Sequence, residues 1–307
     1  MFSFLLGTTC LTMLTAWLKS MLSVERSKPL TKTERFTQWS SLLYVVVGTS
    51  MLFIPSLWGF LYKVELLGRS AGYIQLGGLA FVVEGYLLVI ASKSEHKFPG
   101  HGHINITVLT RLILVNMSLT ILYLKGTAPV RCIAFIAALD NSLAVGVFLV
   151  WISTEEGATL GLFFKEIFDL LLRFPVGPCS SIAVLLLGIV QFSAGLYLKD
   201  VTRLSHALSL DPFLGYSGLF LSFYFSLNAA HAVLYISNGQ AVSTTFNKGC
   251  VFYRVAINIL VLFVLGAANR IETSLSVFLI SVEMILAAFI LVSLSCDKDN
   301  YDQGKEK

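Results

Sequence analysis

The feature that most constrains this chain is a series of apolar stretches that are each long enough to cross a bilayer. A transmembrane helix needs about 20 predominantly apolar residues. Charged residues make up only 13% of the chain, whereas a soluble domain carries about 25%. We therefore predict an all-α, multi-pass membrane protein with eight spans: 39–62, 72–92, 106–124, 131–152, 176–198, 212–237, 249–268 and 273–295.

Two terminal segments lie outside these spans. Residues 1–35 comprise an apolar segment from Phe2 to Leu18 and a basic linker. The segment lacks the positive start and the small-residue cleavage site of a signal peptide. We expect a signal anchor or an interfacial helix, with a ninth span as an alternative. The polar tail, residues 296–307, is expected to be frayed.

The basic residues are distributed unevenly between the two sides of the predicted membrane. Side A, which carries 13 of the 22 lysines and arginines, comprises residues 19–35, the loops 93–105, 153–175 and 238–248, and the tail. Basic residues favour the cytosolic side, so we expect side A to be cytosolic and refer to the opposite side as side B. The lipid bilayer is the expected partner, and no basic block indicates a nucleic acid.

One loop has the pattern of an interfacial helix. In "LGLFFKEIFDLLLRF" (160–174), Lys165, Asp169 and Arg173 recur every four residues among leucine, phenylalanine and isoleucine. A single polar stripe on an otherwise apolar helix is typical of a helix that lies in the membrane interface. We predict such a helix within 153–175, with an extension of a neighbouring span as the alternative.

Rare intramembrane charges recur at one spacing and indicate an internal duplication. The interval from Arg111 to Arg254 is the same as the interval from Asp140 to Glu283. The dipeptide Gly-Tyr at 72–73 recurs at 215–216 with this same offset. "SSLLYVVVG" (40–48) also matches "SSIAVLLLG" (180–188), at a slightly shorter offset.

The shared offset predicts two four-helix repeats, residues 36–152 and 176–295. Four spans return the chain to its starting side, so the two repeats must have the same orientation, related by an axis along the membrane normal.

Charged residues inside spans are expensive unless they are paired. In each repeat an arginine on the third span precedes an acid on the fourth by the same interval, which predicts the pairs Arg111–Asp140 and Arg254–Glu283. At 1.5 Å per residue, Arg111 lies about 8 Å inside side A and Asp140 about 18 Å. Glu84, at about 12 Å by the same rule, is a second candidate partner for Arg111.

The second, third and fourth spans of both repeats hold polar residues, whereas the first spans are comparatively apolar. Each repeat therefore resembles a bundle with a polar centre. The candidate binding residues are Glu84, Arg111, Asn116, Asp140, Asn141, Asn228, His231, Arg254, Asn258 and Glu283.

Two functions fit these centres. Buried ion pairs and amides fix helix packing in lipid, which favours a structural or adaptor protein. Intramembrane ionisable residues also mark solute and proton pathways, and the first repeat has two acids for one arginine. His231 either titrates or binds a backbone carbonyl group. We favour a transporter of a small solute or a proton.

Catalysis and metal binding receive little support. The chain lacks the G-x-S-x-G, H-E-x-x-H, P-loop and G-x-G-x-x-G motifs, and we expect no enzyme and no cofactor. His96, His101 and His103 lie in "EHKFPGHGH", where Glu95 is the only further ligand type. We therefore expect no metal site.

The pattern of the repeat resembles the DoxX-like group of four-helix membrane proteins. The resemblance covers 36–152 and 176–295 and depends on the span spacing, the "LGGL" stretch (76–79) and the early arginine of the third span. The second repeat lacks the double glycine and has Phe220-Leu221 instead. The resemblance implies a compact membrane bundle that is present twice, and it assigns no site residue.

Overall fold

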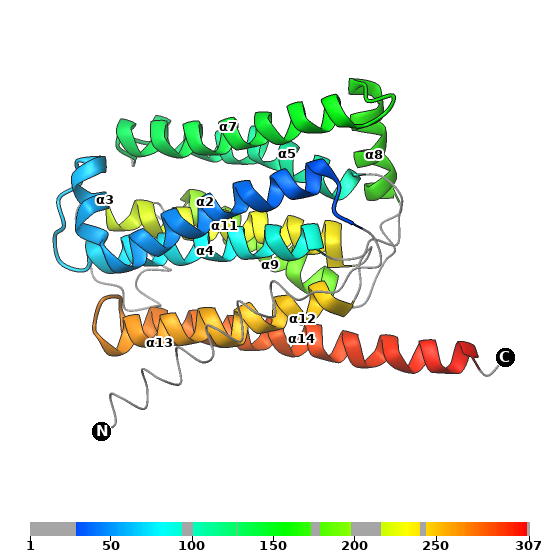
Figure 1. The fold of residues 1–307 in the computed structure, drawn as a ribbon. Coiled ribbons are helices and arrows are strands. Elements are labelled where there is room, and N and C mark those ends of the chain that lie inside the picture. The colour runs from blue at the N-terminus through cyan, green and yellow to red at the C-terminus, as the bar shows by residue number, and fades with distance from the viewer. Residues whose placement is uncertain are drawn as a thin grey trace.

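The computed structural model describes residues 29–93, 101–126, 128–172, 179–197, 216–239 and 244–305. All regular elements in these ranges are helices (Figure 1). The predicted apolar segment from Phe2 to Leu18 lies outside the described residues.

Within the described residues, seven helical segments are long and apolar enough to cross a membrane, which is compatible with the predicted multi-pass membrane protein. They are α2 (Lys32–Phe53), α4 (Ser70–Lys93), α5 to α6 (Gly102–Leu124), α7 (Val130–Thr154), α11 (Ser217–Gly239), α12 to α13 (Thr244–Ala267) and α14 (Thr273–Lys305). The remaining predicted span, 176–198, forms α9 (Cys179–Tyr197), whose described apolar part, Ile182–Gly195, is shorter.

The first span differs from its predicted limits of 39–62. It begins earlier because Thr31 and Glu34 form a capping box, in which each side chain accepts a hydrogen bond from the backbone N–H of the other residue. It ends at Phe53, and Pro55 starts the separate helix α3 (Pro55–Tyr62). Proline fits the first turn of a helix and not its interior.

The helices form three layers around a central pair (Figure 1). In the apolar windows of α4 and α11, 94% and 83% of the residues are buried, whereas 28–39% are buried in the other five spans. α2 packs on α4, and α9 packs on α11. α5 and α7 lie on one side of this middle layer, and α12, α13 and α14 lie on the other. The other five spans therefore carry most of the exposed surface.

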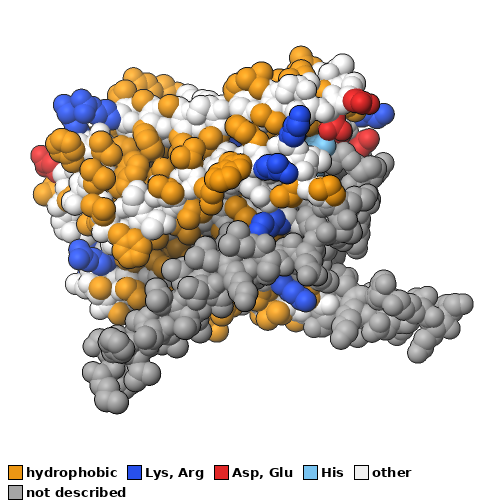
Figure 2. All heavy atoms as spheres, viewed as in Figure 1, with side chains coloured by type: hydrophobic (Ala, Val, Ile, Leu, Met, Phe, Trp, Pro, Cys, Tyr) orange, Lys and Arg blue, Asp and Glu red, His pale blue; other side chains and the backbone are white. Residues whose placement is uncertain are grey.

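The outer surface is apolar, as the predicted membrane location requires. Figure 2 shows hydrophobic side chains spread across the middle of one face. Large apolar side chains such as Trp39, Val46 and Phe60 are 68%, 63% and 79% exposed. Such a surface is unfavourable in water and suited to lipid.

Glycines allow α2 and α4 to pack closely. A Cβ atom on Gly48 would lie 2.5 Å from the carbonyl oxygen of Gly78, and one on Gly195 would lie 2.8 Å from that of Ser222. At the interval that separates Arg111 from Arg254, Ser222 corresponds to Leu79, the residue after Gly78. Gly195 therefore meets α11 at the position that this offset relates to the Gly48 contact, whereas Gly188 packs against Ala232. The match of Gly48 with Gly188 stays a prediction.

Both spans that carry a buried arginine contain a π-helical turn. η1 (Arg111–Val115) separates α5 (Gly102–Thr110) from α6 (Asn116–Leu124), and η2 (Tyr253–Asn258) separates α12 (Thr244–Phe252) from α13 (Ile259–Ala267). π-helical turns are rare and occur mostly at functional sites. Each turn contains one of the two buried arginines, so the local geometry recurs at positions that the duplication predicts to correspond.

The predicted helix within 153–175 is present as α8 (Leu160–Leu172), which confirms a helix in this loop. It lies across the end of the bundle where α7 ends (Figure 1). Phe163 and Ile167 pack into a buried cluster with Trp151, whereas Phe164 and Phe168 are exposed. Its location in a membrane interface stays a prediction.

The polar tail differs from its prediction. Residues 296–305 continue α14 as a helix to Lys305 instead of fraying. A helix that is already nucleated adds one hydrogen bond for each further residue, so it extends readily beyond its apolar part.

Candidate functional site

A small cavity lies where the first half of the chain meets α11. Glu84 on α4, Arg111 on η1 and Asp140 on α7 all line it, together with apolar residues of α11. It has room for about one water molecule. The three charged side chains are 3–6% exposed. The sequence predicted these residues for one polar centre, and the structure brings them to one cavity.

Arg111 does not form the direct pair with Asp140 that the sequence predicts. The three guanidinium nitrogens have no hydrogen-bond partner among the described residues. The guanidinium carbon lies 5.1 Å from the centre of the Tyr44 ring, within cation–π distance. Asp140 instead accepts a hydrogen bond from the Tyr44 hydroxyl group. The direct pair fails because this tyrosine contacts both charged groups.

Tyr44 is the residue of this site that the sequence analysis missed. It lies on α2, in a first span expected to be comparatively apolar, and it is 1% exposed. The one available signal is a phenolic hydroxyl group in a run of leucine and valine, because a buried hydroxyl group needs a partner.

Glu84 pairs with His231 across the two halves of the chain. Oε2 of Glu84 lies 3.2 Å from Nε2 of His231, and both side chains are buried. The sequence left two interpretations of His231 open, and one of them was a bond to a backbone carbonyl group. The structure shows contact with a carboxyl group instead. The second predicted partner of Arg111, Glu84, contacts the histidine instead.

The predicted pair in the second half is confirmed. Nη1 of Arg254 lies 2.5 Å from Oε2 of Glu283, and both side chains are buried. The guanidinium carbon of Arg254 also lies 4.9 Å from the centre of the Tyr253 ring. A buried charge is tolerated when it is paired in this way.

The two centres approach each other through aromatic rings. The ring centroids of His231 and Tyr253 are 6.4 Å apart in an edge-to-face arrangement. His231 therefore contacts Glu84 of the first half and the tyrosine that stacks on Arg254 of the second. The polar groups form one connected core between the halves.

The predicted asparagines do not line the cavity. Asn116 and Asn141 exchange hydrogen bonds of 2.7 and 3.1 Å on a partly exposed face. Asn228 donates to the carbonyl oxygen of Tyr224 on its own helix. Asn258 is buried at the end of η2. Asn116 and Asn141 therefore join two helices, and Asn228 stabilises its own helix.

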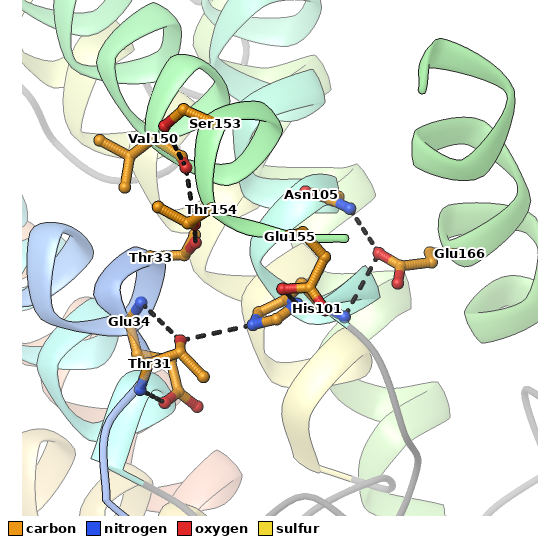
Figure 3. Close-up of polar contacts among 10 residues, drawn as sticks. All are labelled: Thr31, Thr33, Glu34, His101, Asn105, Val150, Ser153, Thr154, Glu155 and Glu166. Carbon is orange, nitrogen blue, oxygen red and sulfur yellow. Dashed lines mark hydrogen bonds and ion pairs between the residues drawn. The ribbon is translucent and has the colours of Figure 1, made fainter. Parts of the chain in front are cut away.

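A second polar cluster lies at the side A end of the bundle (Figure 3). His101 lies 3.4 Å from Glu155 through Nδ1 and 3.4 Å from Thr31 through Nε2. Glu166 on α8 accepts hydrogen bonds from the Asn105 side-chain amide at 2.7 Å and from the backbone N–H of His101 at 3.3 Å. Partial burial raises the pKa of Glu166.

This cluster shows that the segments around residues 31, 101, 155 and 166 meet at one end, as the side A assignment requires. His101 and His103 have ring centroids 6.5 Å apart. The described part of the chain contains no group of three or more histidine, cysteine, aspartate or glutamate residues arranged to hold a metal. His96 lies outside the described residues.

The opposite end holds a third cluster, which the sequence analysis did not predict. Arg69 lies 3.2 Å from Glu272 and donates to Asn269 at 2.7 Å. The Tyr73 hydroxyl group also donates to Glu272. These contacts join the start of α4 to the loop before α14, so they fasten the two halves at side B.

Comparison with protein-family models, with curated proteins and with solved structures finds no match for this chain. The functional assignment therefore depends on the geometry of these clusters.

Proposed function

We propose that this chain is a non-enzymatic, multi-pass membrane protein that conducts protons. In this proposal Glu84, Arg111, Asp140 and His231 form the proton-binding centre. The single observation that carries the proposal is the cavity shared by Glu84, Arg111 and Asp140. The cavity gives a water molecule room to contact all three charged groups, and Arg111 has no other hydrogen-bond partner among the described residues.

Charge balance supports an exchangeable proton. The centre holds two carboxyl groups and one guanidinium group, with a histidine 3.2 Å from Glu84. An uncompensated charge inside a membrane protein is costly. The centre is neutral when a proton is bound either to His231 or to one carboxyl group. These sites lie close together, so the proton has more than one place to bind.

The size of the cavity favours a proton over a solute. The space accommodates about one water molecule, whereas pockets for small organic ligands are about 300–1,000 Å³. A bound water molecule would bridge Arg111 to the carboxyl groups and would carry protons between them.

The alternative is a structural or adaptor protein, and one observation favours it for the second half. Arg254 and Glu283 form a closed pair at 2.5 Å. We therefore assign a stabilising role to this pair and the proton-binding role to the centre in the first half.

We further propose that the chain has eight spans arranged as two parallel four-helix repeats, as in the DoxX-like pattern, with side A in the cytosol. Two π-helical turns at corresponding arginines support the duplication. Matching helix contacts also support it, since α2 packs on α4 as α9 packs on α11.

The test uses the full-length protein in liposomes that contain a pH-sensitive dye. We expect the wild-type protein to dissipate an imposed pH gradient, and Asp140→Asn or Glu84→Gln to abolish this flux at equal amounts of folded protein. Glu272→Gln is the matched control, because this buried acid belongs to the side B cluster. Wild-type vesicles that are as tight as protein-free vesicles would refute the proposal.

A further inference from the structure

The buried face of α5 carries a polar stripe that leads from side A toward the cavity. His103, Thr107 and Arg111 recur at every fourth position, which places them on one face of the helix. Their exposed fractions are 5%, 6% and 3%. Polar groups on an inward helix face are unexpected unless they have a role in the interior.

This stripe is continuous with the proton-binding centre. Thr107 and Thr110 line the same cavity as Glu84 and Asp140. Thr107 is one helical turn from His103, a rise of about 6 Å. His103 in turn lies near the side A cluster, since its ring is 6.5 Å from that of His101.

The opposite direction has no comparable stripe on the helices that carry the acids. On α7, the positions one and two turns from Asp140 toward side B are Ile136 and Cys132, both buried. On α4, the corresponding positions relative to Glu84 are Ala80 and Leu76, which are also buried. Ile136, Ala80 and Leu76 offer no site for a proton, and Cys132 is a buried thiol with no polar neighbour at these positions of α7, so these faces carry no stripe like that of α5.

We infer that protons reach the cavity from side A through His103 and Thr107, with the His103 imidazole as the intermediate carrier. This inference rests on the proposed proton-conducting function. The neutral imidazole accepts a proton at one ring nitrogen from side A. The imidazolium then releases a proton from the other nitrogen to a water molecule, and this water passes a proton to a carboxylate in the cavity. The Thr107 hydroxyl group donates to the Ile104 carbonyl oxygen, so its free lone pair can hold that water as an acceptor. The imidazole returns to its neutral form, so the step is balanced.

Several charged or titratable groups surround this route. Those at its outer end are His101, Glu155 and Glu166, and those at its inner end are Glu84, Arg111, Asp140 and His231. His103 lies on α5 between these two sets of groups, one helical turn before Thr107, which lines the cavity.

The experiment measures proton flux of the full-length protein in dye-loaded liposomes. We expect His103→Gln and Thr107→Val to slow the flux several-fold, and Thr107→Ser, which keeps the hydroxyl group, to preserve it. Glu272→Gln is the matched control, because this buried acid belongs to the side B cluster and lies away from the route, and it should leave the flux unchanged. Circular dichroism and gel filtration compare the folded fraction of each variant.

Chemical rescue separates a proton carrier from a structural residue. We expect added imidazole to restore flux in His103→Ala and to leave Thr107→Val slow. If His103→Gln and Thr107→Val conduct like the wild-type protein while Asp140→Asn is inactive, the route is overturned and the proton-binding centre stands. If the wild-type protein shows no flux, both proposals fail.

Discussion

Nε2 of His231 lies 3.2 Å from Oε2 of Glu84, and this contact joins α11 of the second half to α4 of the first. These two helices are the most buried of the seven long apolar ones. The boundary between the halves is therefore held by an electrostatic contact as well as by apolar packing, and the same contact belongs to the proposed proton-binding centre.

The contact predicts a measurable coupling between the two residues. Glu84→Gln and His231→Gln should each lower the free energy of unfolding, and the double variant should lose less than the sum. We expect a coupling energy of about 0.6–1.7 kcal/mol, typical of polar contacts between membrane helices. Unfolding in mixed micelles measures it. A matched cycle of Glu84→Gln with Asn269→Ala, at the side B end, should be additive.

The closed pair in the second half predicts a large loss of stability without a change in mechanism. Glu283→Gln leaves the Arg254 guanidinium buried and uncompensated, so it should lower the free energy of unfolding by about 3–5 kcal/mol. The conservative variant Glu283→Asp should lose less. Proton flux per folded molecule should be unchanged in Glu283→Asp; an abolished flux would show that this pair also belongs to the conducting centre.

The glycine contact between α2 and α4 predicts a contrast between adjacent positions. A Cβ atom at Gly78 would lie 2.7 Å from the carbonyl oxygen of Gly48, whereas one at Gly77 would lie 3.5 Å from its nearest neighbour. Gly78→Ala should therefore cost about 1–3 kcal/mol through overpacking, and Gly77→Ala should be tolerated. Thermal unfolding of the two variants tests this, and equal midpoints would contradict the packing described here.

The contact of α8 with α5 predicts a pH dependence of stability. Burial raises the pKa of Glu166 above its ordinary value of 4.5, so the folded chain holds a proton that the unfolded chain releases. The contribution of this group to stability should therefore increase as the pH falls through the raised pKa, and level off below 4.5. Glu166→Gln should remove this component, which unfolding measurements at several pH values would reveal. If the difference in free energy of unfolding between the wild-type protein and Glu166→Gln does not change with pH, the role given to Glu166 is contradicted.

The architecture was predictable because it depends on the length and composition of segments. Long apolar runs specify helices in lipid whatever their neighbours are, and their approximate limits follow from the sequence. The break at Pro55 and the early start at Thr31 depend on local capping, which a hydropathy pattern does not resolve. Gly188 and Gly195 both pack against α11, and a short sequence match does not determine which of them corresponds to Gly48.

The charged members of the site were predictable, whereas Tyr44, the position of the asparagines and some of the pairings were not. Rare charges inside spans identify the buried acids and arginines, and the interval between arginine and acid was sufficient for Arg254 and Glu283. The same interval failed for Arg111, because Tyr44 approaches from a helix that is distant in the sequence. The contact of Glu84 with His231 likewise depends on how the two halves pack against each other, which no local pattern contains.

The central claim is that the first-half centre exchanges a proton, and a difference titration tests it most directly. Purified wild-type protein and the variant Glu84→Gln/Asp140→Asn are titrated in detergent over about pH 5 to 8, the range of a histidine-linked centre. The account predicts that the wild-type protein takes up an additional proton in this range, while Glu272→Gln titrates like the wild type. Titration curves of the wild-type protein and the double variant that superimpose throughout the range would contradict it.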